Sequence, residues 1–64
     1  MKNFIKVVIK NSGTEMRINA NSIVLYEAAN GCNNVTDILL VGGKAVRVLG
    51  TPEEIDNKIE ECLC

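Results

Sequence analysis

The sequence predicts an α+β fold: a small five-stranded antiparallel β-meander, or a partly closed barrel, followed by one C-terminal helix. Before Gly50, five short apolar segments alternate with turn residues, which is typical of strands joined by hairpins. After Gly50, the run 51–63 combines a helix start signal with one apolar stripe at helical spacing. With 64 residues, the chain is expected to form a single domain, 1–64, near the lower size limit for folding alone.

The first two strands are predicted at about 4–10 and 15–20, because every second residue in both is apolar. The segment 11–14 between them has turn chemistry, with Gly13 free to adopt a positive φ. At 19–22 the alternation breaks, so the chain is expected to turn a corner there. The inward side chains are expected to be Ile5, Val7, Ile9, Met16, Ile18 and Ala20.

The third, fourth and fifth strands are predicted at about 22–28, 35–41 and 44–49. Asn30-Gly31 is a strong hairpin signal, although the polar residues that follow lengthen the loop. Gly42-Gly43 is a tight two-residue connection of the kind that joins antiparallel neighbours. These turns therefore predict consecutive hairpins.

A helix is predicted at about 52–62, because the residues at its start can satisfy the unpaired amides of a first turn. Thr51 is a natural N-cap, Pro52 is tolerated at the first helical position, and Glu54 completes a capping box with Thr51. That helix needs a surface to pack on, which the strands are expected to provide. Its apolar stripe is formed by Ile55, Ile59, Cys62 and Leu63.

The central strands carry apolar residues on both faces, and one short helix can cover only one of them. Either the sheet curls into a barrel, or a second protein surface covers the face left open. We expect a dimer or higher oligomer; an exposed face that binds a different protein is the next option. The residues expected on this oligomer or partner face are Val24, Tyr26, Leu39 and Val41.

The composition offers few groups for catalysis. The chain has no histidine, so a serine or cysteine nucleophile has no ready general base. Adjacent carboxylates such as Glu53 and Glu54 point about 100° apart on a helix and do not share a site. We therefore expect that the protein is not an enzyme and has no catalytic residues and no cofactor.

Three cysteines, an odd number, favour reduced thiols and a cytoplasmic location. Cys62 and Cys64 can coordinate a soft metal ion such as Zn²⁺, with Cys32 as a third ligand. Alternatively, Cys62 packs as a small hydrophobic residue and Cys64 belongs to a frayed end. We favour packing and expect no metal site. No targeting segment and no membrane span are expected either.

The basic residues leave two further functions open. Arg17, Lys44 and Arg47 are candidate contacts for a small anionic ligand, such as a nucleotide held between subunits. Single-stranded nucleic acid is the other alternative, but only Phe4 and Tyr26 offer rings on which bases can stack. The formal net charge of −1 gives no overall attraction to nucleic acid or to an anionic membrane.

The order of motifs resembles the family of the small flagellar-operon protein FlbD, which includes short relatives encoded by phages. The resemblance spans nearly the whole chain and transfers no catalytic residue. The resemblance implies a phage setting, and the apolar second face leads us to expect a non-catalytic module that self-associates and binds a protein partner, as a regulator, inhibitor or adaptor. The shared frame is Gly13 with Glu15, Ile18-Asn19, Ile23, Gly42-Gly43-Lys44, Val46, Val48, and a capped final helix from Thr51 to Ile59.

Overall fold

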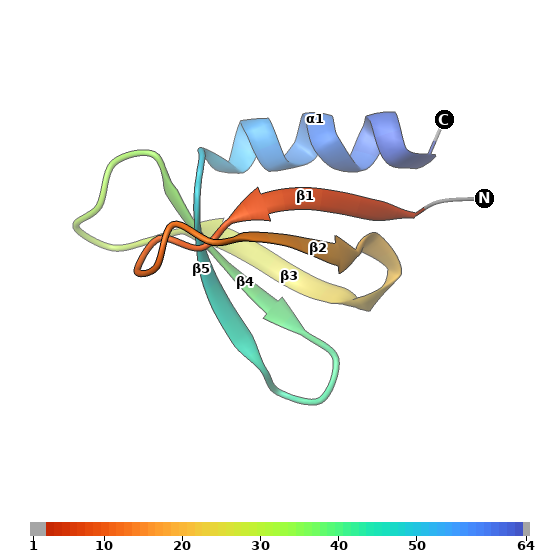
Figure 1. The fold of residues 1–64 in the computed structure, drawn as a ribbon, viewed down its shortest axis with the longest axis horizontal. Coiled ribbons are helices and arrows are strands. Elements are labelled where there is room, and N and C mark those ends of the chain that lie inside the picture. Colours follow the sequence, from red (N-terminus) through yellow and green to blue (C-terminus); the bar gives the residue numbers. More distant parts are fainter. Residues whose placement is uncertain (1–2, 64) are drawn as a thin grey trace.

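The computed structural model describes residues 3–63, which form five antiparallel strands and one C-terminal helix (Figure 1). The predicted α+β class is confirmed, and the strand and helix bounds differ from the predicted ones by at most two residues. In chain order the elements are β1 (Phe4–Val8), β2 (Glu15–Asn19), the short 3-10 helix η1 (Ala20–Ser22), β3 (Ile23–Ala28), β4 (Val35–Leu40), β5 (Ala45–Leu49) and α1 (Pro52–Leu63).

The described strands form two sheets and no closed barrel. β1 pairs with β2 in one sheet, and β4 lies between β3 and β5 in the other. η1 is the corner between the sheets, where the side-chain oxygen of Asn19 accepts a hydrogen bond from the amide of Asn21 at 2.9 Å. The corner predicted at 19–22 is therefore confirmed.

β1 is shorter than predicted: the amide of Ile9 still donates to the carbonyl oxygen of Thr14 at 2.9 Å, but from this residue on the chain also pairs with β5. Ile9 forms an isolated bridge with Val48 of β5. The amide of Lys10 then donates to the carbonyl oxygen of Arg47 at 2.9 Å. This crossing ties the two sheets together at one end.

The core lies between the two sheets and the helix. The predicted inward alternation in β1 and β2 is confirmed, because Ile5, Val7 and Ile18 are buried. Ile38 of β4 is completely buried, so the middle strand of the larger sheet forms the floor of the core. The buried cluster contains Ile5, Val7, Ile18, Ile38, Val48 and Ile55.

Helix α1 begins at the predicted capping box and lies alongside β1 (Figure 1). The amide of Thr51 donates to Oε1 of Glu54 at 2.8 Å, and the amide of Glu54 donates to Oγ1 of Thr51 at 3.2 Å. Within residues 3–63, no helix is both long enough and apolar enough to cross a membrane. The predicted stripe packs on the core through Ile55, Ile59 and Cys62.

Candidate functional site

A β-bulge in β3 decides which of its residues face the core and which face solvent. Tyr26 pairs with the buried Ile38, whereas Leu25 pairs with Leu39. The register shifts just before Leu25, where Val24 is the extra residue. Val24 is 57% exposed and Leu25 is 48% exposed, so both side chains meet solvent.

Tyr26 therefore lies on the core side of the sheet. The prediction that it shares one face with Leu39 and Val41 is wrong. The Tyr26 side chain packs against the core, and its hydroxyl donates a hydrogen bond to the Asp56 carboxylate on α1. Three effects raise the pKa of Tyr26 to about 12. The largest is the hydrogen bond to Asp56, followed by burial and by the negative charges of Asp56 and Glu60. Tyr26 thus joins the helix to β3.

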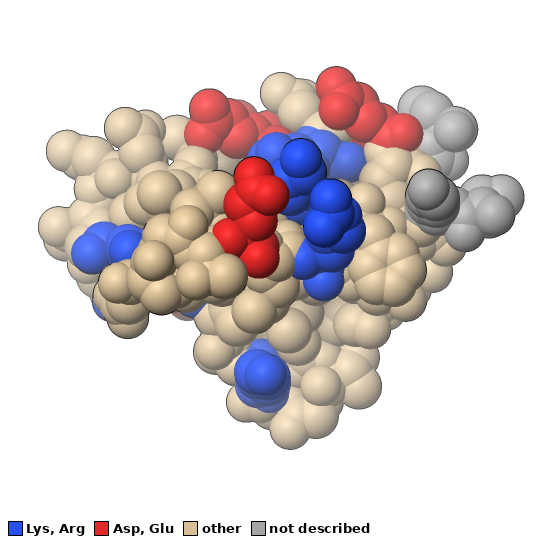
Figure 2. Space-filling model, in the orientation of Figure 1, with Lys and Arg blue, Asp and Glu red and all other residues tan. Residues whose placement is uncertain are grey.

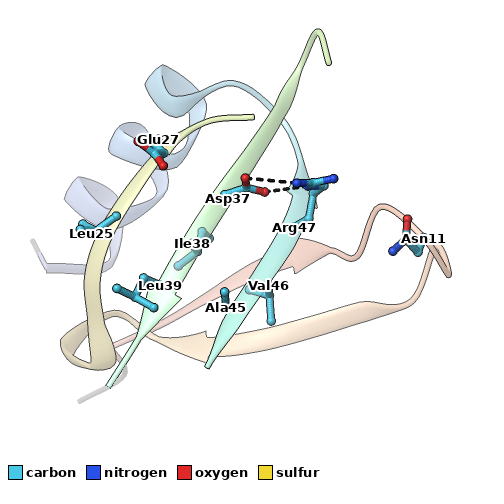
Figure 3. A pocket seen from close by; sticks show the side chains of 9 residues that line it. All are labelled: Asn11, Leu25, Glu27, Asp37, Ile38, Leu39, Ala45, Val46 and Arg47. Carbon is cyan, nitrogen blue, oxygen red and sulfur yellow. Dashed lines mark hydrogen bonds and ion pairs between the residues drawn. The ribbon is translucent and has the colours of Figure 1, made fainter. Parts of the chain in front are cut away.

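We call the solvent side of β3, β4 and β5 the outer face (Figure 3). It carries two rows of cross-strand neighbours, an apolar row of Leu25, Leu39 and Ala45 and a charged row of Glu27, Asp37 and Arg47. The two rows line a shallow hollow of about 630 Å³, which Asn11 of the β1–β2 turn also lines. Val24, next to Leu25 in the sequence, and Val41, two residues after Leu39, are exposed apolar residues as well.

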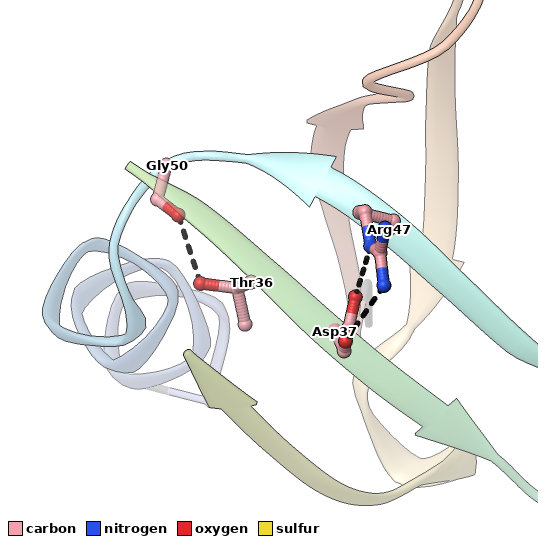
Figure 4. Close-up of polar contacts among 4 residues, drawn as sticks. All are labelled: Thr36, Asp37, Arg47 and Gly50. Carbon is pink, nitrogen blue, oxygen red and sulfur yellow. Dashed lines mark hydrogen bonds and ion pairs between the residues drawn. The ribbon is translucent and has the colours of Figure 1, made fainter. Parts of the chain in front are cut away.

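An ion pair occupies the β4–β5 end of the charged row (Figure 4). Nε of Arg47 lies 2.8 Å from Oδ1 of Asp37, and its Nη2 lies 3.4 Å from Oδ2. The hydrogen bond and the charge of Asp37 raise the pKa of Arg47 above its ordinary value. Because the guanidinium has five N–H donors, Arg47 keeps donors for a second acceptor.

The three candidate anion contacts are not brought into one site. Arg17 lies on β2 opposite Lys6, Lys44 precedes β5, and Arg47 is paired with Asp37. The hollow that contains Arg47 is lined by neither Arg17 nor Lys44. On the face shown in Figure 2, acidic and basic side chains lie next to one another, so no broad field of one sign forms there.

The thiols are spread over the described chain. Cys32 lies in the β3–β4 loop, and Cys62 is half-buried against the core. Cys64 lies outside the described residues, so the pair it forms with Cys62 in the sequence is not placed. In the part of the chain that the structure describes, no group of three Cys, Asp or Glu side chains could hold a metal ion.

The sequence prediction missed three residues of the outer face, Leu25, Glu27 and Ala45. Alternation over 22–28 does not by itself decide which side chains point inward, and no residue type marks the bulge at Val24. The charged row was recognisable only once the register had placed its three members side by side.

No family model, no curated protein and no solved structure matches the chain. The resemblance to the FlbD family therefore stays a prediction. What the outer face binds has to be inferred from its own residues.

Proposed function

We propose that the chain is a non-catalytic binding module whose outer face packs against a folded protein surface, as a regulator, inhibitor or adaptor. The observation that carries this proposal is one contiguous apolar surface that the described residues leave uncovered. On a protein this small, such a surface is typical of an interaction site. Its members are Val24, Leu25, Leu39, Val41 and Ala45.

The layout of the outer face supports docking on a protein. Protein interfaces combine an apolar centre with a polar, hydrogen-bonding edge, and the apolar and charged rows reproduce that division. The shallow hollow is open and offers few groups that could enclose a small molecule, since ligand pockets bury most of their ligand.

Chemistry at the outer face is disfavoured by its residues. Asp37 and Arg47 satisfy one another, and the chain has no histidine to act beside them. Sequestration of a small anion and binding of single-stranded nucleic acid are less favoured. Both would need Arg17, Lys44 and Arg47 to converge, whereas Arg17 lies on β2 and neither Arg17 nor Lys44 lines the hollow that contains Arg47.

The proposal is tested by placing a charge at the centre of the apolar row. Leu39→Glu should abolish any complex that native mass spectrometry detects for protein freshly purified from cells of its natural source. The matched control is Phe4→Glu, because Phe4 is 55% exposed on β1, in the other sheet. If wild-type protein is a bare monomer under these conditions, or if Leu39→Glu keeps its complex, the proposal is wrong.

A further inference from the structure

We propose that the occupant of the outer face is a second copy of this chain, related by a two-fold axis that runs along β4. This inference rests on the proposed function and names its partner. In the resulting dimer, Glu27 faces Arg47 of the partner subunit, and Leu39 faces its own equivalent across the axis.

The charged row provides the first argument. Glu27 lies directly opposite Asp37, and like charges opposite one another in a sheet are destabilising. Among residues 3–63 Glu27 has no ion-pair partner, whereas Arg47 is held by Asp37 and has N–H donors to spare. A second Arg47 placed over Glu27 would relieve this repulsion.

The order of charges across the strands makes the face complementary to itself. From β3 to β5 the row reads negative, negative, positive. A two-fold axis along β4 places β3 of one subunit over β5 of the other. Each row then faces the same row of the partner subunit. Glu27 then meets Arg47 of the partner subunit twice in each dimer, and Asp37 lies on the axis, where its own Arg47 neutralises it.

The apolar row fits the same axis. Leu25 on β3 faces Ala45 of the partner subunit, so a large side chain meets a small one, and Leu39 fills the centre. Packed sheets keep their strands within about 30° of one another, which this axis allows. The other in-plane axis, across the strands, would lay the charged row over the apolar end and bury unpaired charges.

The size of the face sets the strength of the dimer. A standard interface removes roughly 800 Å² per partner from solvent, which is about a fifth of the 4369 Å² that this chain exposes. One face of a three-stranded sheet supplies only part of that area. We therefore expect a reversible dimer with a dissociation constant in the micromolar range.

The test is a charge exchange followed by sedimentation equilibrium. Glu27→Arg and Arg47→Glu should each weaken self-association by about tenfold or more, because each places like charges over one another. An equimolar mixture of the two variants should associate more tightly than either variant alone, since the heterodimer regains both contacts between positions 27 and 47, one with reversed polarity and one as in the wild type. Glu15→Arg, on β2, is the matched control for net charge and should leave the dimer unchanged.

Circular dichroism and the urea midpoint are measured for each variant. A variant that keeps the wild-type spectrum and midpoint is folded, so its weaker association reports on the interface. If the mixture associates no more tightly than either variant alone, this two-fold arrangement is overturned. It is also overturned if wild-type protein stays monomeric at high micromolar concentration. In that case the proposed function survives only if native mass spectrometry finds a different protein whose binding Leu39→Glu removes.

Discussion

The buried hydroxyl of Thr36, in the middle strand β4, donates a hydrogen bond to the main-chain carbonyl of Gly50, 2.8 Å away (Figure 4). The amide of Gly50 donates in turn to the carbonyl oxygen of Asn34 at 2.6 Å. Gly50 is thus held from both sides at the link between β5 and α1. The point at which the helix leaves the sheet is set by these two bonds.

Thr36→Val keeps the shape of the side chain and removes its hydroxyl, which leaves the Gly50 carbonyl without this donor. We expect the free energy of unfolding in urea to fall by about 1–3 kcal/mol. Thr36→Ser is the control, because it keeps the hydroxyl and loses only the methyl group, so it measures the contribution of the methyl group alone. An unchanged urea midpoint for Thr36→Val would show that the bond does not stabilise the link.

Gly50→Ala should be costly for two reasons. Gly50 has φ of +119°, and a Cβ there would lie 3.1 Å from Oε1 of Glu54, the oxygen that caps Thr51. Backbone strain and a disturbed cap together should lower the free energy of unfolding by about 2–4 kcal/mol. Gly31→Ala is the control, since its φ is +74° with open space around it, and it should cost roughly 1 kcal/mol. Equal losses for the two variants would contradict this account.

The hydrogen bond from Tyr26 to Asp56 predicts how the protein responds to alkali. The folded-state pKa of about 12 lies above the ordinary value of 10.0. The contribution of Tyr26 to stability is therefore fully present below pH 10 and is lost as the pH rises through 12. The chain has one tyrosine and no tryptophan, so near-ultraviolet absorbance of the phenolate follows Tyr26 alone.

Asp56→Asn is the matched variant for this titration. It removes the charge and the strongest acceptor, so the midpoint should move back toward the ordinary value of tyrosine. A wild-type midpoint near pH 10 would mean that the Tyr26 hydroxyl is not bound to α1 in solution.

The helix should depend on Ile55 far more than on Ile59. Ile55 is completely buried, and Ile55→Ala should cost about 2–5 kcal/mol, much of the stability of so small a domain. Ile59 is half-buried, so Ile59→Ala should cost about 1–2 kcal/mol. Thermal unfolding followed by circular dichroism compares them. A larger loss for Ile59→Ala would mean that α1 packs through a different face.

Local chemistry explains why much of the fold was predictable. The Thr51–Glu54 capping box needs only residues three positions apart, and the alternation of Ile5 and Val7 needs only one strand with a buried face. Both signals lie within a single element. The structure confirms them because no distant contact overrides them.

The candidate site was harder to predict because it depends on register between strands. Val24 and Tyr26 are two residues apart, so regular alternation would place them on the same face of the sheet. The bulge at Val24 breaks that alternation. One extra residue changes the face that every earlier position in a strand presents. The row of Glu27, Asp37 and Arg47 likewise combines three strands, and no single segment contains it.

The most direct measurement of the central claim is methyl NMR of the wild-type chain over a dilution series. Docking of the outer face predicts that the methyl resonances of Leu25, Leu39 and Val41 shift with concentration, while those of Val8 on β1 stay fixed. If all methyl resonances are independent of concentration up to the millimolar range, and no other protein shifts them, the outer face is not a binding surface.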